Sequence, residues 1–99
     1  MLILTGRFTV KNESLAMLLE LCHGMYAASR SEEGCMSYNL WADSDCSLNF
    51  MFFEEWDCRE SLERHFQTPH FGRFMSLFPS MIQGEPVIQT YESAGPQAV

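Results

Sequence analysis

The spacing of apolar residues along this chain of 99 residues changes repeatedly between a period of two and a period near 3.6. This alternation is the strongest constraint on its fold. Residues 2–10 alternate in the manner of a half-buried strand, with leucines and a phenylalanine on one face. Residues 14–31 then place apolar side chains at steps of three and four, which predicts a long helix with one buried face. Gly34 follows an acidic pair and is expected to end that helix.

The middle of the chain predicts a hairpin and a broken helix. Two apolar segments, residues 35–42 and 48–56, are separated by a polar turn, which is typical of paired strands. Asp57 is expected to cap the helix that follows. Thr68 and Pro69 then interrupt this helix and start another, because threonine is a favoured cap and proline is favoured at the first helical position.

A last strand is predicted at residues 87–91, after a Gly-Glu-Pro turn at residues 84–86. The predicted order is therefore β-α-β-β-α-β with the second helix split, which is the plan of a ferredoxin-like α+β domain. We expect one domain over residues 1–99, with an ordered core at about residues 2–92 and a loose tail at residues 93–99.

Composition and charge narrow the classes of partner. The chain is 46% hydrophobic, with eight Phe and seven Met, and so small a fold leaves part of this apolar surface for a partner subunit. Its net charge is −7 and its six Lys and Arg residues are scattered, which argues against nucleic acid or a membrane surface as partners. The four cysteines form no C-x-x-C pair and no secretory signal is recognisable, so we expect free thiols in a reducing cytoplasm.

Two histidines are the first candidates for chemistry. His65 lies between Leu62 and Phe66 on the buried face of its predicted helix. The pattern by itself favours a core histidine satisfied by hydrogen bonds, and the alternative is a general base whose pKa burial has lowered. His70 lies in the first turn after the helix break, where free backbone N–H groups disfavour a positive charge. It is expected either to contact a ligand or to brace the break.

An acidic residue among aromatic ones is the second unusual feature. Glu54 shares one face of its predicted strand with three aromatic residues. It is expected either to be hydrated at a rim or to be buried and paired, with Arg7 or a histidine as partner. With Tyr38 on the neighbouring strand, this face suggests an aromatic pocket for a flat organic molecule, and an ordinary aromatic core is the alternative. The three aromatic residues are Phe50, Phe52 and Trp56.

Local motifs for metals and cofactors are absent from the sequence. His65 and His70 are separated by a proline, and no third ligand stands at helical spacing from them. The sequence has no H-E-x-x-H, glycine-rich nucleotide loop or C-x-x-C-H element. We therefore expect neither a bound metal nor an organic cofactor.

Three motifs, in order and in spacing, resemble those of the antibiotic biosynthesis monooxygenase family. They are E-x-G-C at residues 32–35 with Tyr38 after it, E-x-W at residues 54–56, and H-x-x-x-x-H-F at residues 65–71. The resemblance extends over about residues 2–92. It implies a homodimeric α+β barrel, with a pocket between sheet and helices in each subunit. It also implies a cofactor-free quinol or anthrone monooxygenase, in which O₂ is the co-substrate.

The resemblance further implies roles for individual residues. In this chemistry a base removes a hydroxyl proton, and the resulting anion reacts directly with O₂ inside a dry aromatic cavity. His65 is then expected as base or proton shuttle and His70 as a second donor. Trp56 and Tyr38 are expected to form the wall and to orient the substrate. Glu54 is expected to hold an imidazole or an arginine in place, and the expected substrate-binding residues are Arg7, Phe50, Phe52, Phe66 and Phe74.

Other branches of the same superfamily provide alternatives. Haem-degrading members use an asparagine and an axial histidine at the places of Gly6 and Met75, which argues against haem chemistry here. An isomerase of a phosphorylated autoinducer-2 derivative also carries the Thr-Pro-His element, so an isomerase or tautomerase is the alternative enzyme function. A phosphorylated substrate would need cations, for which Arg7 and Arg73 are the candidates. The third interpretation is a dimeric, non-enzymatic ligand-binding protein of a stress response.

Overall fold

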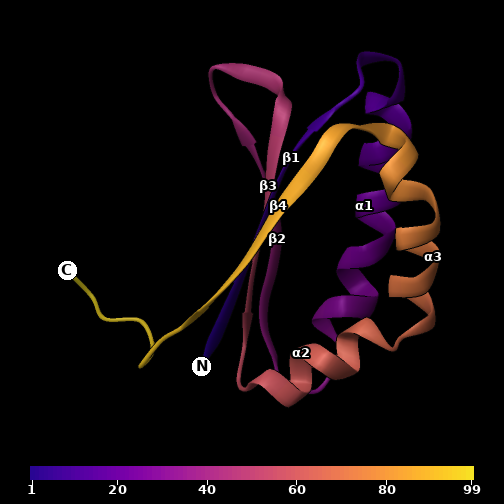
Figure 1. Ribbon diagram of the computed structural model, residues 1–99. Helices are drawn as coiled ribbons and strands as arrows, with labels where there is room; N and C mark the ends of the chain where they lie inside the picture. Colours follow the sequence, from indigo (N-terminus) through magenta and orange to yellow (C-terminus); the bar gives the residue numbers. More distant parts are fainter.

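The computed structural model describes residues 1–99 and contains four strands, three α-helices and two short 3-10 helices. The four strands form one antiparallel sheet in which the second strand and the last are the edges, and all three helices lie on one side of it (Figure 1). The predicted ferredoxin-like α+β order is confirmed. In chain order the elements are β1 (Leu2–Val10), a 3-10 helix (Asn12–Ser14), α1 (Leu15–Arg30), β2 (Cys35–Asp43), β3 (Cys46–Trp56), α2 (Arg59–Phe66), α3 (Pro69–Leu77), a 3-10 helix (Phe78–Met81) and β4 (Ile82–Glu92).

The helix break behaves as predicted, but the cap of α2 does not. Thr68 caps α3, its hydroxyl oxygen accepting from the backbone N–H of Phe71 at 3.2 Å, and Pro69 is the first helical residue. The prediction that Asp57 caps α2 is wrong, because Cys58 occupies the cap position. The Asp57 carboxylate instead accepts a hydrogen bond from the Ser61 hydroxyl one turn later.

The turn predicted at residues 84–86 is also wrong. These residues lie inside β4, which begins at Ile82 and has extra residues opposite β1 at this point. Gly84 accommodates the irregularity with φ +65°. Because β4 is an edge strand, Pro86 can lack a backbone N–H without breaking the hydrogen-bonded ladder inside the sheet.

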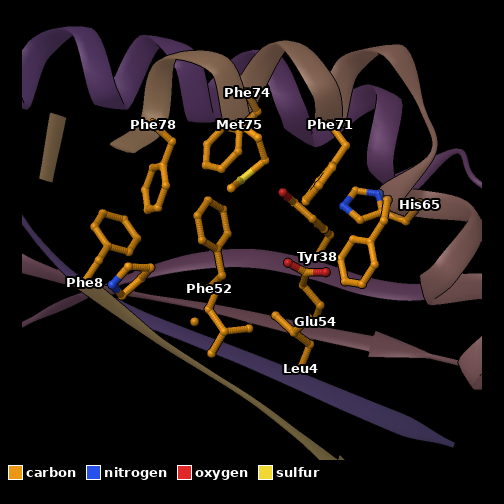
Figure 2. Close-up of a pocket in the computed structure, with 14 residues that line it drawn as sticks. Leu4, Phe8, Tyr38, Phe52, Glu54, His65, Phe71, Phe74, Met75 and Phe78 are labelled. Atoms are coloured by element: carbon orange, nitrogen blue, oxygen red, sulfur yellow. The ribbon is translucent and has the colours of Figure 1, made fainter. Parts of the chain in front are cut away.

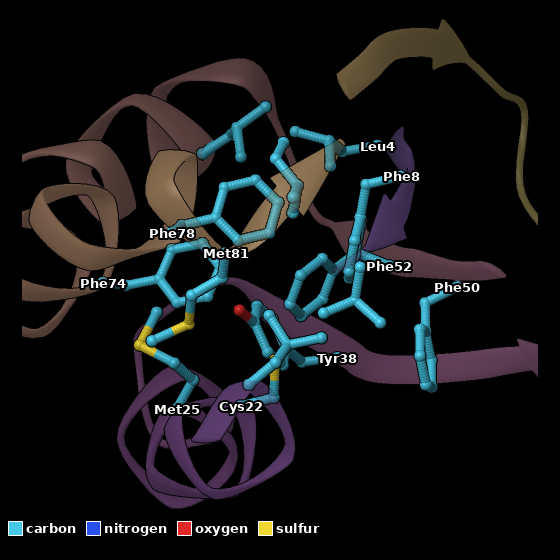
Figure 3. Close-up of a cluster of buried hydrophobic side chains, with 14 of the residues drawn as sticks. Leu4, Phe8, Cys22, Met25, Tyr38, Phe50, Phe52, Phe74, Phe78 and Met81 are labelled. Carbon is cyan, nitrogen blue, oxygen red and sulfur yellow. The ribbon is translucent and has the colours of Figure 1, made fainter. Parts of the chain in front are cut away.

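The hydrophobic core lies between the sheet and the helices (Figure 3). Helix α1 contributes Leu18, Cys22 and Met25, which recur at the steps of four and three that the sequence predicts. Phe74 stacks on Phe78 with ring centroids 4.8 Å apart, and other strand and helix aromatics meet edge to face around them. Such aromatic pairs add about 0.5–1.5 kcal/mol each beyond the burial of their surface. No helix is long and apolar enough to cross a membrane.

A single glycine shapes the turn between α1 and β2. Gly34 has φ +86°, a left-handed conformation that other residues adopt only with strain. Its carbonyl accepts a hydrogen bond from the backbone N–H of Asp57 at 2.9 Å, which joins this turn to the start of α2. A Cβ atom at this position would overlap the side chains of Ser61 and Asp57. These contacts fix the backbone conformation of the turn. Glu32 is part of the same turn, so its position is fixed as well.

We predict that Gly34→Ala destabilises the protein by about 2 kcal/mol or more, because the strained backbone and the overlap add together. The matched control is Gly24→Ala on the exposed side of α1, where nothing lies within 4 Å of the new Cβ. That change should stabilise the protein by up to about 1 kcal/mol, since alanine favours helix. Urea denaturation of the three proteins tests the pair, and equal midpoints for Gly34→Ala and the wild type would contradict it.

Candidate active site

A cavity of about 280 Å³ lies between the sheet and the segment formed by α2 and α3 (Figure 2). Ten of its 14 lining residues are hydrophobic. Only Tyr38, Glu54 and His65 bring ionisable groups to it. The volume is near the lower end for pockets that bind organic molecules, so a molecule of one or two rings suits it. Six phenylalanines line the walls: Phe8, Phe52, Phe66, Phe71, Phe74 and Phe78.

Glu54 reaches the cavity because the period of two on β3 points it inward. In the register of the sheet it lies between Leu4 on β1 and Tyr38 on β2. Its side chain is only 5% exposed, and its Oε1 accepts a hydrogen bond from the indole Nε1–H of Trp56 at 3.1 Å. Burial raises the pKa of Glu54 to about 7, with the Trp56 hydrogen bond acting against this rise and the charge of Glu32 adding to it.

His65 is held by a carboxylate that the sequence did not single out. Its Nδ1 is 2.6 Å from Oε2 of Glu32, and Nε2 of His70 is 2.7 Å from the same oxygen. We call these three residues the Glu32 cluster. An ionised carboxylate only accepts hydrogen bonds, so each of these two ring nitrogens carries the proton. We infer that Nε2 of His65 keeps its lone pair, and this nitrogen is on the side of the ring that faces the cavity (Figure 2).

The environment of His65 favours its neutral form. The residue is 1% exposed, and burial lowers its pKa, with the hydrogen bond and charge of Glu32 acting against that shift. Aromatic rings surround the imidazole: the ring centroid of Trp56 is 5.0 Å away and that of Phe71 is 5.2 Å away. Tyr38 meets it nearly edge-on at 5.8 Å. These contacts leave the imidazole one orientation, with its basic nitrogen toward an apolar space.

Most of the predicted site residues meet at this cavity, and two others support it from behind. Trp56 is fully buried and acts on the cavity through Glu54. His70 is half-buried and shares the Glu32 carboxylate with His65. The predicted residues that line the cavity directly are Tyr38, Phe52, Glu54, His65, Phe66 and Phe74.

Two predicted substrate-binding residues lie elsewhere. Arg7 is exposed on the opposite face of the sheet, because Gly6 and Phe8 on either side of it point into the cavity. Phe50 packs against Phe8 with ring centroids 5.8 Å apart and belongs to the core outside the cavity. Arg73 faces a separate hollow between α1 and α3. No lysine or arginine lines the cavity.

The predicted partner of Glu54, Arg7 or a histidine, is also wrong. Its hydrogen bond comes from Trp56, and it has none with Arg7 or a histidine. The carboxylate that holds the imidazoles is Glu32, which is 33 residues from His65 along the chain. The only signal for Glu32 in the sequence is its place in the E-x-G-C motif, since helical or strand spacing cannot relate a turn to two helices that far away.

The raised pKa of Glu54 predicts a pH-dependent loss of stability. The pKa of Glu54 is about 7 in the folded protein and 4.5 in an ordinary glutamate. The contribution of Glu54 to the free energy of unfolding is therefore fully present below pH 4.5 and is lost as the pH rises through about 7. Glu54→Gln has no carboxyl group to ionise, so it does not lose this stability as the pH rises. The free energy of unfolding of the variant relative to wild type should therefore increase by roughly 3 kcal/mol between pH 4 and pH 8. Urea denaturation across this range measures the gain. Glu85→Gln, an exposed control, should show none, and a pH-independent difference for Glu54→Gln would contradict the prediction.

Several known proteins resemble this chain in sequence and in fold. The chain is 33% identical over 98 residues to a Synechocystis protein whose name gives no function, and 31% identical over 66 residues to a Mycobacterium tuberculosis protein named as a candidate monooxygenase. The matched residues make up 99% and 67% of this chain, and 67% and 64% of those relatives, so this chain spans about two thirds of their length. A crystal structure of an antibiotic biosynthesis monooxygenase superposes with TM-score 0.89 at 26% identity, over 96% of this chain and 100% of that one. The family model of antibiotic biosynthesis monooxygenases matches residues 1–77. The chain is therefore a member of the antibiotic biosynthesis monooxygenase family.

Proposed function

We propose that the protein is a cofactor-independent monooxygenase that oxidises a small, uncharged dihydroxyaromatic or quinol with O₂. The observation that carries the proposal is the orientation of His65. Glu32 holds its Nδ1–H at 2.6 Å, so that Nε2 is free to accept a proton inside an aromatic cavity. A neutral imidazole there is a suitable general base near neutral pH. The family of the chain supports the type of reaction.

The proposed reaction needs no external reductant. His65 takes the proton of one substrate hydroxyl, and the anion transfers electrons to O₂ and forms a C–O bond at a ring carbon that carries hydrogen. The resulting hydroperoxide loses water and leaves a quinone. One oxygen atom remains on the ring and the other leaves as water, and all four electrons come from the substrate. The apolar walls favour this sequence, because they exclude water from the anion and the peroxide.

Two other polar groups have roles in this proposal. Tyr38 lines the cavity together with Glu54 and His65 (Figure 2), and we assign its hydroxyl, which also lies close to the Ser29 side chain on α1, the role of a hydrogen-bond donor to a substrate oxygen. Burial, with the nearby Glu54 charge, raises the pKa of Tyr38 and keeps it protonated. Glu54, with a pKa of about 7, can accept a hydrogen bond from the second hydroxyl or relay its proton.

The charge of the cavity determines which substrates the proposal includes. No cation lines it, while Glu54 brings a carboxyl group to its floor. A substrate phosphate or carboxylate would lose its hydration there without a compensating ion pair. We therefore propose a neutral substrate, and this feature argues against a phosphorylated isomerase substrate.

We predict that His65→Ala lowers the rate of O₂ consumption with an active quinol at least about 100-fold, the usual contribution of a general base. The measurement is O₂ uptake by chelator-treated protein against a panel of hydroquinones and hydroxynaphthalenes. His23→Ala is the matched control, because His23 is exposed on α1 and does not line the cavity. Circular dichroism verifies that both variants fold.

Different results identify the alternatives. If no compound in the panel raises O₂ uptake above background, the monooxygenase proposal fails. Turnover under strict anaerobiosis would show instead an isomerase or tautomerase that uses the same base. A ligand that binds tightly and is recovered unchanged, with and without O₂, would indicate a binding protein.

We also propose that the protein is a homodimer that covers the helix-free face of the sheet. Figure 1 shows all three helices on the other face. Trp41 is 58% exposed and Val87 is 44% exposed, and both border a hollow on the open face beside Arg7. Apolar side chains of this size on a small domain favour burial against a second copy.

In sedimentation experiments at micromolar concentration we expect twice the chain mass of 11.4 kDa. Val87→Asp should shift the equilibrium toward monomer, because the new carboxylate would have to be buried without a partner. Met17→Asp, on the exposed surface of α1, is the control and should remain dimeric. A wild-type protein of single-chain mass would refute the dimer.

A further inference from the structure

We propose that the Glu32 cluster is a binding site for one divalent transition-metal ion of the zinc type, and that this ion competes with the basic form of His65. Each of the three residues offers one ligand atom: Oε2 of Glu32, Nδ1 of His65 and Nε2 of His70. These atoms all lie within 4.8 Å of one another. Two imidazole nitrogens and one carboxylate oxygen are a ligand set that Zn²⁺, Co²⁺ and Fe²⁺ accept, with open positions for water.

The three ligand atoms have to move by small distances to hold a metal. The two nitrogens are 2.6 and 2.7 Å from the carboxylate oxygen and within 4.8 Å of each other. Ligands about 2.0–2.1 Å from a tetrahedral metal are separated by about 3.3 Å. The Glu32 carboxylate therefore has to retreat by less than about 1 Å from each ring, and the two nitrogens have to approach each other by up to about 1.5 Å. The turn after α1, together with α2 and α3, already brings the three side chains together, so the site requires side-chain rotations of this size.

Exposure and charge also suit a cation. His65 is buried, but His70 is 21% and Glu32 14% exposed, so the cluster lies near the surface and water can complete the coordination. The exposed carboxylate of Glu33 is next in the chain, and the whole chain has a net charge of −7. A field of this sign raises the local concentration of cations.

The ion changes what His65 can do, because a neutral imidazole has one lone pair. In the hydrogen-bonded cluster Nδ1 carries the proton and Nε2 has the lone pair. When Nδ1 coordinates a metal, the proton is on Nε2, which faces the cavity. His65 then donates a hydrogen bond to a ligand and accepts no proton from it. This consequence rests on the proposed function of His65 as base, whereas metal binding itself does not.

Titration of the chelator-treated full-length chain with Co²⁺ tests the site, because the visible d–d absorption of bound Co²⁺ reports its ligands. We expect one Co²⁺ per chain, displaced by Zn²⁺, with nitrogen and oxygen ligands. Glu32→Gln and His70→Ala should each weaken binding by at least about tenfold. Both residues are partly exposed, so these variants are expected to fold even if His65→Ala does not. His23→Ala, the exposed control histidine, should bind as the wild type does.

Three results would overturn the site. The first is the absence of d–d absorption at millimolar Co²⁺, and the second is Co²⁺ binding that both variants leave unchanged. The third is an intense thiolate charge-transfer band, which would assign the ion to one of the four free cysteines. In a separate assay, Zn²⁺ should abolish O₂ uptake and a chelator should restore it. If Co²⁺ binds as expected and no substrate is ever oxidised, the proposed function fails while the metal site stands.

Discussion

One carboxylate oxygen joins three separate parts of the fold. Oε2 of Glu32 accepts from His65 on α2 and from His70 at the start of α3, while Glu32 itself belongs to the turn that ends α1. Charge-assisted hydrogen bonds of this kind are shorter and stronger than neutral ones. The chemistry of the cavity depends on it, because an acceptor at Nδ1 of His65 leaves the lone pair of the imidazole on Nε2. Gly34, two residues after Glu32, makes the turn possible.

The apolar cavity brings an acid and a base toward the same pH range. Burial raises the pKa of Glu54 to about 7 and lowers that of His65, since it disfavours the charged form of each. The hydrogen bond that Trp56 donates to Glu54 limits the first shift, and the hydrogen bond that His65 donates to Glu32 limits the second. Burial therefore favours the uncharged form of both groups beside the six phenyl rings. This combination suits chemistry on a neutral aromatic molecule better than chemistry on an anion.

Prediction from sequence succeeded where the relevant physics is local. A period of two places Glu54 and Trp56 on one face, and Thr68 with Pro69 marks the helix break. Prediction failed where the local structure depends on contacts with residues that are close in space. Asp57 has the side chain of a cap but bonds to Ser61 instead, and the turn expected at residues 84–86 is absorbed into an edge strand. Phe50 shares the strand face of Glu54 but lies too far along β3 to reach the cavity.

The sequence by itself determined the α+β order, the inward faces of β1 and β3 and the burial of His65, because these follow from periodicity and capping within short segments. Only the tertiary structure decided that Glu32 meets both histidines. The reason is distance along the chain. No repeat of side chains relates a turn after the first helix to a histidine 33 residues later, and only the packing of α2 and α3 beside that turn brings them within hydrogen-bonding distance.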